Sequence, residues 1–181
     1  MKGRLLTAMV AACVASIAIA GAQTAPAAPH TRDAIVSAAR SVVATARYAT
    51  LVTLDATGQP QARIVDPFAP EDDLAIWVAT NPLSRKVGEI AADPRVTLLY
   101  FDSASESYVT VIGSARLVRD PAEKAKRWKP EWAGFYKDAN RGDDYLLIRI
   151  DVSRLEVVAA ALGMTNDPAT WRPVVLDLRR P

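Results

Sequence analysis

The run LAIWVATNPLSRKVGEIAADPRV, residues 74–96, decides how this chain folds. Its first part, residues 74–79, is apolar and rich in strand-forming side chains, which predicts a buried strand that ends at Thr80. The dipeptide Asn81-Pro82 then breaks the strand, because proline lacks the backbone N–H that a sheet requires. The run therefore predicts a strand, a sharp turn and then a short helix.

The turn and the helix bring together groups that suit a phosphate. Ser84 is the expected helix N-cap, residues 85–92 are the expected helix, and Asp93-Pro94 ends it. Free backbone N–H groups, a hydroxyl and the cationic side chains of Arg85 and Lys86 then point toward one place, as a phosphate monoester requires. A capped surface helix with two solvated basic residues is the alternative interpretation.

The rest of the chain predicts antiparallel β structure with peripheral helices. A helix with Thr31 or Asp33 as its cap is expected through residue 46, and Gly58 closes a turn between two strands. The expected strands cover residues 48–54, 60–65, 74–80, 96–101, 108–118 and 145–152, the last with an extension through residue 160. This pattern favours a mainly β fold, a small six-stranded antiparallel barrel.

Three features carry more specific expectations. Residues 96–101 lack polar alternation beyond Thr97, which predicts a strand covered on both faces. Gly113 lies in mid-strand and indicates a bulge or the close approach of another group, such as a barrel bend or a flavin ring. A helix capped by Asp120 is expected to carry an aromatic stripe that forms core or a dimer interface, with a substrate platform as the alternative. The stripe consists of Trp128, Trp132, Phe135 and Tyr136.

The N-terminus predicts export. Lys2 and Arg4 precede an apolar run that ends at Ala20, so residues 1–22 are interpreted as a signal peptide cleaved after Ala22. This address implies a periplasmic or secreted protein without stable membrane insertion after cleavage. A lipoprotein form anchored through Cys13 is disfavoured because the apolar run continues past that residue. Residues 23–32 are then a tether, 33–160 the folded domain and 161–181 a C-terminal extension.

Composition excludes several classes of function. The chain has 181 residues, half of them hydrophobic, with 22 basic and 20 acidic side chains. Removal of the leader takes away two basic residues, and the resulting neutral protein gives no reason to expect nucleic acid as a partner. The single cysteine leaves with the leader and the single histidine, His30, lies in the tether. A metal centre or a Cys-His pair is therefore not expected.

Several motifs in a fixed order resemble one family. They are Arg63-Ile64-Val65, Thr80-Asn81, Ser84-Arg85-Lys86, residues 93–99 and residues 108–115. Together they resemble the pyridoxamine 5'-phosphate oxidase-like superfamily of FMN-binding split barrels, and within it the general stress protein branch. The resemblance covers roughly residues 34–158. It implies a six-stranded split barrel and a homodimer with flavin at the subunit interface.

The resemblance also implies which residues bind the cofactor. Arg63, Arg85 and Lys86 would contact the flavin phosphate, and Tyr108 stands where many members have a glutamine that touches the ring. The full set of implied FMN contacts is Arg63, Ile64, Val65, Ala79, Thr80, Ser84, Arg85, Lys86 and Tyr108. FAD in place of FMN stays open. No catalytic residue is assigned.

The chain departs from the true oxidases where their substrate binds. The lysine that holds the substrate phosphate in those enzymes corresponds to Phe68, and the later tyrosine and arginine correspond to positions near Lys126 and Pro130. Oxidation of pyridoxamine phosphate is therefore not expected. The expected function is an exported FMN-binding protein, with a flavin-dependent oxidoreductase of unassigned substrate as the leading form. A non-enzymatic flavin carrier and a deazaflavin- or haem-binding barrel remain alternatives.

Overall fold

The structure, a computed structural model, describes residues 30–136 and 143–179. The expected signal peptide, Cys13 and most of the tether lie outside the described residues. The elements are α1 (Arg32–Ala46), β1 (Ala49–Leu54), β2 (Pro60–Val65), β3 (Ile76–Thr80), α2 (Arg85–Ala92), β4 (Arg95–Asp102), β5 (Ser107–Val118), α3 (Pro121–Lys126), η1 (Pro130–Gly134), β6 (Leu146–Val158), η2 (Ala160–Leu162) and β7 (Val174–Asp177).

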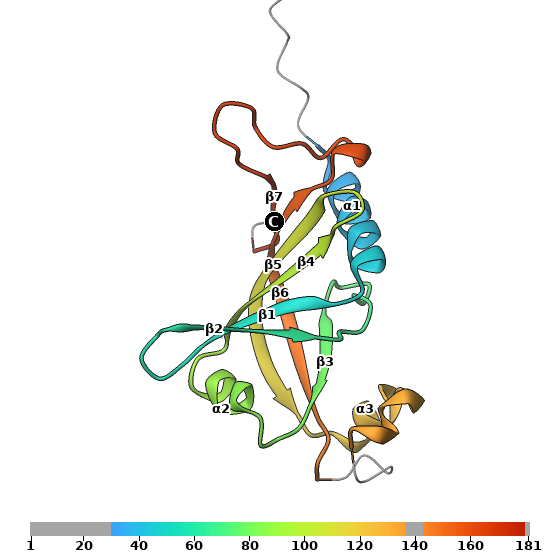
Figure 1. The fold of residues 1–181 in the computed structure, drawn as a ribbon, viewed down its shortest axis with the longest axis vertical. Helices are drawn as coiled ribbons and strands as arrows, with labels where there is room; N and C mark the ends of the chain where they lie inside the picture. Colours follow the sequence, from blue (N-terminus) through green and yellow to red (C-terminus); the bar gives the residue numbers. More distant parts are fainter. Residues whose placement is uncertain (1–29, 137–142, 180–181) are drawn as a thin grey trace, which may run out of the picture.

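One antiparallel sheet forms the body of the molecule. Its strand order is β2-β1-β4-β5-β6-β3, and β7 adds to β6 as a seventh strand (Figure 1). The chain just beyond β2 returns to β3 through a bridge between Pro67 and Val78. The sheet therefore curls until its two outer strands approach each other, which confirms the split barrel. The strand β7 lies within the expected C-terminal extension, residues 161–181.

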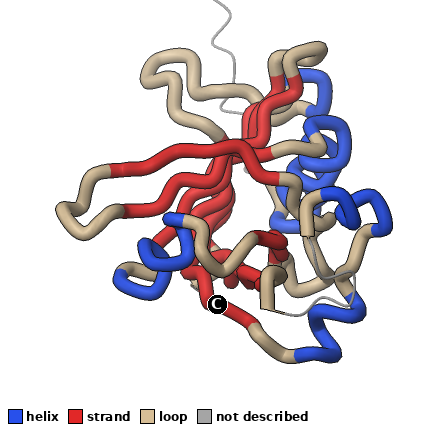
Figure 2. The backbone as a smooth tube through the Cα atoms, turned by 60° about the horizontal axis from the view of Figure 1, so that its bottom comes forward, coloured by secondary structure: helices blue, strands red, loops and turns tan. Residues whose placement is uncertain are grey.

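Helix α1 closes one side of the sheet. Thr31 caps its N-terminus by accepting a hydrogen bond from the backbone N–H of Ala34, one of the two caps that the sequence allowed. The buried face of α1 carries Ile35, Val42 and Val43, which join the main core of the sheet. In Figure 2 this helix runs alongside the strands while α2 lies at the opposite end of the sheet. The main core therefore lies between α1 and the inner face of the barrel.

The bulge expected at Gly113 is present. The pairing of β5 with β6 shifts register between Ile112 and Gly113. A Cβ atom at Gly113 would collide with the backbone carbonyl of Asp151. The group that approaches the glycine closely is therefore the neighbouring strand, and the flavin ring is not needed to explain it.

Two expectations about packing were wrong. Strand β4 is buried on one face only, and Leu99 and Phe101 are exposed on the other, because no part of residues 30–136 or 143–179 covers the outside of the barrel there. The stripe of aromatic residues does not lie on one helix: α3 ends at Lys126 and a 3-10 turn begins at Pro130, since proline cannot continue the preceding helix.

The aromatic cluster forms nevertheless, by a different route. Trp128, Trp132 and Tyr136 pack against Tyr145 with ring centroids 5.0–6.1 Å apart, and they form a second small core. Phe135 stays outside this core and is 81% exposed. In the described residues, no helix has the length and hydropathy needed to cross a bilayer.

Candidate functional site

The turn from β3 into α2 gathers three polar side chains. Lys86 donates a hydrogen bond from Nζ to Thr80 Oγ1 at 2.9 Å, and the Thr80 and Ser84 hydroxyl oxygens are 3.0 Å apart. Ser84 occupies the N-cap position of α2, as expected, but its side chain makes no capping hydrogen bond. Its hydroxyl faces Thr80 instead, so its side chain satisfies no backbone N–H group of α2, although its carbonyl oxygen accepts a hydrogen bond from the Val87 N–H at 2.9 Å.

A buried carboxylate joins this turn to β2. Arg63 donates from Nη2 to Glu89 Oε2 at 2.7 Å and from Nη1 to the hydroxyl of Thr53. Thr53 in turn donates to Glu89 Oε2 at 2.5 Å, and Arg85 Nε lies 2.8 Å from Glu89 Oε1. The Glu89 side chain is only 5% exposed. This carboxylate therefore holds two of the expected phosphate-binding arginines in place.

The cluster carries excess positive charge. Arg63, Arg85 and Lys86 contribute three cations, and Glu89 contributes one anion, which leaves a net charge of +2. Burial raises the pKa of Glu89, but hydrogen bonds from Thr53 and Arg63 and the nearby arginine charges outweigh this effect and the pKa lies below 4.5. Burial, with the charge of Arg63 second, lowers the pKa of Lys86 below its usual 10.5. A dianionic ligand would balance this charge.

A pocket of about 450 Å³ lies beside the cluster. Four of the expected flavin-binding residues line it, namely Ile64, Val65, Ala79 and Lys86. The other lining residues are Arg47, Tyr48, Asp66, Glu131, Trp132, Phe135 and Tyr136. Its volume lies within the range usual for small-molecule sites. The structure thus brings eight of the nine expected residues to one region: four in the pocket and Arg63, Thr80, Ser84 and Arg85 in the adjoining cluster.

The aromatic wall of this pocket comes from the segment after α3. Trp132 and Tyr136 have ring centroids 6.2 Å apart and pack on Tyr145 behind them. Burial, helped by the negative charge of Asp144, raises the pKa of Tyr136 to about 12. The Tyr136 hydroxyl is therefore neutral at physiological pH, and the wall offers flat apolar rings for another ring system.

Tyr108 is the one expected residue that belongs to neither the pocket nor the cluster. The register pairs Ala79 with Leu147 and Leu147 with Val118, whereas Tyr108 pairs with Val158 at the far end of β5. Ten residues of strand separate these two ends, roughly 33 Å at the usual rise per residue. Tyr108 is not among the residues that line the pocket.

Sequence reasoning missed the residues that organise the cluster. Glu89 stands four positions after Arg85 on α2, and this spacing is a known signal for a helical ion pair. Thr53 lies diagonally across the β1–β2 ladder from Arg63, since Arg63 pairs with Leu51 and Gln61 pairs with Thr53. The sequence gives a weaker indication of the aromatic wall, because the residues of the wall come from a segment with irregular structure. No group of His, Cys, Asp and Glu side chains suited to a metal occurs in residues 30–136 or 143–179.

Comparison with known proteins identifies the family. The family model described as pyridoxamine 5'-phosphate oxidase matches residues 35–159, more than two thirds of the chain. This chain therefore belongs to the pyridoxamine 5'-phosphate oxidase family, with its split-barrel fold. The match extends from α1 through the end of β6 and includes both the charged cluster and the pocket.

Curated relatives resemble only part of the chain. The pyridoxine/pyridoxamine 5'-phosphate oxidase of Bordetella avium is 44% identical over 64 residues, which cover 35% of this chain and 30% of that protein. The oxidase of Cupriavidus necator is 42% identical over 76 residues, 42% of this chain and 35% of that protein. The chain thus matches only about a third of the length of these relatives.

Solved structures share the fold over most of the chain. A Clostridium acetobutylicum protein related to general stress protein 26 superposes with a TM-score of 0.65 at 14% identity, covering 81% of this chain and 94% of that chain. A Nostoc punctiforme FMN-binding protein related to pyridoxamine 5'-phosphate oxidase gives 0.60 at 15% identity, with 86% and 98% covered. At such identities these similarities concern the fold.

Proposed function

We propose that this chain is an exported FMN-binding protein of the split-barrel class and that it acts as a flavin-dependent oxidoreductase on a substrate other than pyridoxamine phosphate. One observation carries the flavin proposal. The cluster of Arg63, Arg85, Lys86 and Glu89 has a net charge of +2 and adjoins a pocket with an aromatic wall. The export part of the proposal rests on the leader sequence of residues 1–22.

The residues present fit a flavin mononucleotide. A phosphate monoester carries close to two negative charges at neutral pH, which matches the net charge of the cluster. Arg63 adds a guanidinium charge and its remaining N–H donors, since one N–H of each Nη already donates to Thr53 or Glu89. This compact charge favours the terminal phosphate of FMN over the bridging phosphates of FAD. The Nostoc relative, described as FMN-binding, has the same fold.

The ring system would lie against β2 and the aromatic wall. Strand β2 pairs with β1 on one side, so its other edge offers backbone N–H and C=O groups beside Ile64 and Val65. Trp132 and Phe135 would shield the ring from water. A bound flavin supplies hydride or electron transfer, and the protein supplies binding and orientation.

The region that holds substrate phosphate in the true oxidases has a different character here. Phe68 packs edge-on against Trp132 with ring centroids 5.4 Å apart, and Lys129 Nζ lies 4.8 Å from the centre of the Phe68 ring. An apolar ring therefore occupies the position expected for the phosphate-binding lysine. This supports a substrate without that phosphate. If the flavin is bound and no reduced nicotinamide or other donor is oxidised, the carrier alternative replaces the oxidoreductase.

The outer face of the sheet supports a homodimer as part of the proposal. Ile64, Leu99, Phe101 and Tyr108 belong to this face of neighbouring strands, and the first three are 68%, 39% and 55% exposed. Exposed apolar side chains in a contiguous patch mark a protein contact. A second copy seated there would cover them.

The flavin proposal is tested by titrating the purified protein with FMN, FAD, riboflavin and haem. FMN is expected to bind most tightly, because riboflavin lacks the phosphate. Replacement of Arg63 and Lys86 by alanine removes two charged hydrogen-bond donors, each worth about 1.5–3 kcal/mol. The double variant should therefore lose at least about a hundredfold in FMN affinity and little in riboflavin affinity.

The matched control is Arg32→Ala with Lys126→Ala. These two cations are exposed and lie outside the cluster and the pocket. The control should bind FMN as the unmodified protein does. Equal FMN affinity for the Arg63/Lys86 double variant and the control would refute the phosphate placement, and preferential haem binding would replace the flavin proposal with the haem alternative.

A further inference from the structure

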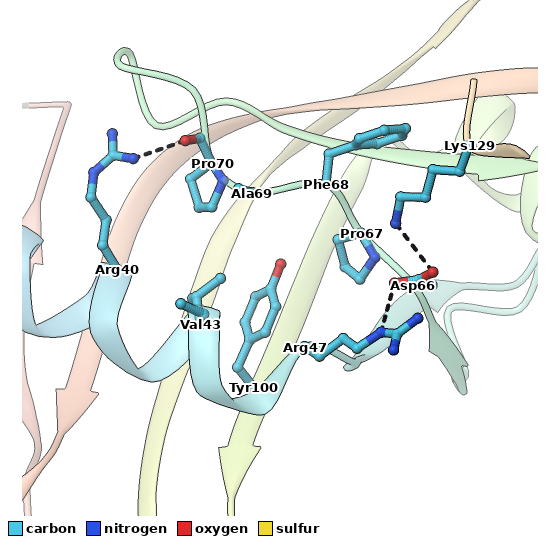
Figure 3. A pocket seen from close by; sticks show the side chains of 11 residues that line it. Arg40, Val43, Arg47, Asp66, Pro67, Phe68, Ala69, Pro70, Tyr100 and Lys129 are labelled. Carbon is cyan, nitrogen blue, oxygen red and sulfur yellow. Dashed lines mark hydrogen bonds and ion pairs between the residues drawn. The ribbon is translucent and has the colours of Figure 1, made fainter. Parts of the chain in front are cut away.

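A second pocket of about 450 Å³ lies between α1 and the loop that follows β2 (Figure 3). Its lining residues are Arg40, Val43, Ala44, Arg47, Asp66, Pro67, Phe68, Ala69, Pro70, Tyr100 and Lys129. It shares Arg47 and Asp66 with the proposed flavin pocket, so the two are neighbours. None of the other nine residues is among the expected flavin contacts.

The floor of this pocket has a buried hydroxyl without a partner. Tyr100 comes from β4 and is 0% exposed, and its hydroxyl makes no hydrogen bond within the described part of the chain. Figure 3 shows the hydroxyl pointing into the space between Val43 of α1 and Pro67 of the loop. Burial raises the pKa of Tyr100 strongly, so the phenol keeps its proton and can donate. A buried donor without a partner costs free energy, which binding of an acceptor would recover.

The wall beside Tyr100 carries two cations and one anion. Lys129 Nζ lies 3.1 Å from Asp66 Oδ2, and Arg47 Nε lies 3.9 Å from Asp66 Oδ1 (Figure 3). The Arg47 guanidinium makes no hydrogen bond to any described residue, so its donors are available. With Asp66 neutralised by one cation, the other cation gives this end of the pocket a positive potential.

The opposite end of the pocket is held in place by hydrogen bonds from Arg40. Arg40 donates from Nη1 to the carbonyl oxygen of Pro70 at 2.8 Å and from Nη2 to that of Glu71 at 2.6 Å. These two bonds fasten the loop to α1, as Figure 3 shows for Pro70. Because its donors are engaged, Arg40 adds charge and rigidity without offering a free fork. Val43, Pro67 and Pro70 supply the apolar surface between the two ends.

We infer that this pocket is a binding site for a small organic anion, a carboxylate on an apolar ring. The ring would lie between Val43 and the prolines of the loop. One carboxylate oxygen would accept the hydrogen bond of Tyr100, and Arg47 with Lys129 would supply the balancing charge. The inference concerns α1 and the loop after β2 and does not depend on the flavin proposal.

The test uses benzoate as the probe and benzamide as its neutral counterpart, measured by isothermal titration calorimetry on the full mature protein. Benzoate is expected to bind in a one-to-one ratio, at least about tenfold more tightly than benzamide, because only benzoate carries the charge that Arg47 and Lys129 balance. Inorganic phosphate, an anion without an apolar body, should not compete with benzoate.

Two variants locate the binding. Tyr100→Phe keeps the ring and removes the hydroxyl, and it should weaken benzoate about tenfold. Arg47→Gln should weaken it by a similar factor, whereas Arg32→Gln, at the other end of α1, should leave the affinity unchanged. Thermal unfolding of each variant shows that it is folded before binding is compared.

The outcomes separate this inference from the flavin proposal. FMN titration of the same samples should give unchanged affinity in Tyr100→Phe, because Tyr100 does not line the flavin pocket. Benzoate binding without flavin binding would uphold this site and refute the other. The inference is overturned if benzoate does not saturate, if benzamide binds equally well, or if both site variants keep full benzoate affinity.

Discussion

Arg63 Nη2 and Glu89 Oε2 lie 2.7 Å apart, and this contact joins an outer strand of the barrel to the helix that follows β3. The Arg63 side chain is 18% exposed and that of Glu89 is 5% exposed. The pair therefore lies where water screens it poorly, and each charge depends on the other.

Glu89→Gln should lower the free energy of unfolding by about 1–3 kcal/mol, because it removes the charge that compensates a largely buried arginine. Urea denaturation followed by circular dichroism measures this loss. Glu156→Gln is the control, since Glu156 pairs with Arg154 in a more exposed setting and should cost less than about 1 kcal/mol. Equal losses of unfolding free energy in the two variants would show that the buried Arg63–Glu89 pair stabilises the fold no more than the more exposed Arg154–Glu156 pair.

The Glu89 contribution should depend on pH in the acid range. Because the folded pKa of Glu89 is lowered, its stabilisation is fully present above the unfolded value near 4.5 and is lost as the pH falls through the lower folded pKa. The stability difference between the unmodified protein and Glu89→Gln should therefore shrink below pH 4.5. Urea midpoints measured from pH 3 to pH 7 check this, and a constant difference would contradict it.

FMN affinity should fall at alkaline pH earlier than an ordinary lysine would predict. Lys86 has a lowered pKa in the free protein, and a bound phosphate favours its charged form. Affinity should be full below the free-protein pKa and decline as the pH rises through it. Fluorescence titration between pH 7 and pH 10 measures the decline, which Lys86→Arg should abolish. Riboflavin, which lacks the phosphate, should show no such fall.

Two glycine-to-alanine changes should have opposite effects. At Gly113 the added methyl group would meet the carbonyl of Asp151, and the strain should cost about 1–3 kcal/mol. Gly88 lies in α2 with nothing within 4 Å of a built Cβ, so alanine there should stabilise by about 0.5–1 kcal/mol through its helix propensity. Thermal unfolding of both variants tests the pair. An unchanged thermal stability of Gly113→Ala would mean that the bulge accommodates the added methyl group without strain.

Phe101→Asp should turn the proposed dimer into a monomer. Phe101 is 55% exposed on the outer face of β4, and a charge in an apolar interface would remain without a partner. Analytical ultracentrifugation measures the change in mass. Leu162→Asp, at an exposed position in η2, is the control that should leave assembly intact. A monomer before any substitution would refute the dimer.

Local rules were sufficient for most of the fold. Side chains alternate along β2, so Gln61, Arg63 and Val65 share one face, and these three are less exposed than Ala62 and Ile64. Asn81-Pro82 and Asp93-Pro94 correctly bounded α2, because proline restricts both the strand before it and the helix it ends. The order of the motifs predicted the split barrel. The family model matches the same part of the chain, residues 35–159, and confirms this prediction.

Long-range packing explains what the sequence could not provide. The ion pair of Arg63 and Glu89 joins residues 26 positions apart, and the Tyr100 hydroxyl lies in a pocket closed by α1 and a distant loop. No local pattern predicts such meetings. The apolar run of β4 looked like a strand covered on both faces because hydrophobicity alone does not say whether the cover comes from the same chain. The cofactor roles of all nine site residues remain predictions.

The hydrogen bonds that Arg63 makes within its own chain also bear on whether the protein can fold before it binds its cofactor. Glu89 and Thr53 accept hydrogen bonds from this arginine before any phosphate arrives, so the charge of Arg63 is compensated without a cofactor. Folding and loading can then be separate steps. If the chain is exported as its leader predicts, it can cross the membrane unfolded, fold empty on the other side and take up its ligand there.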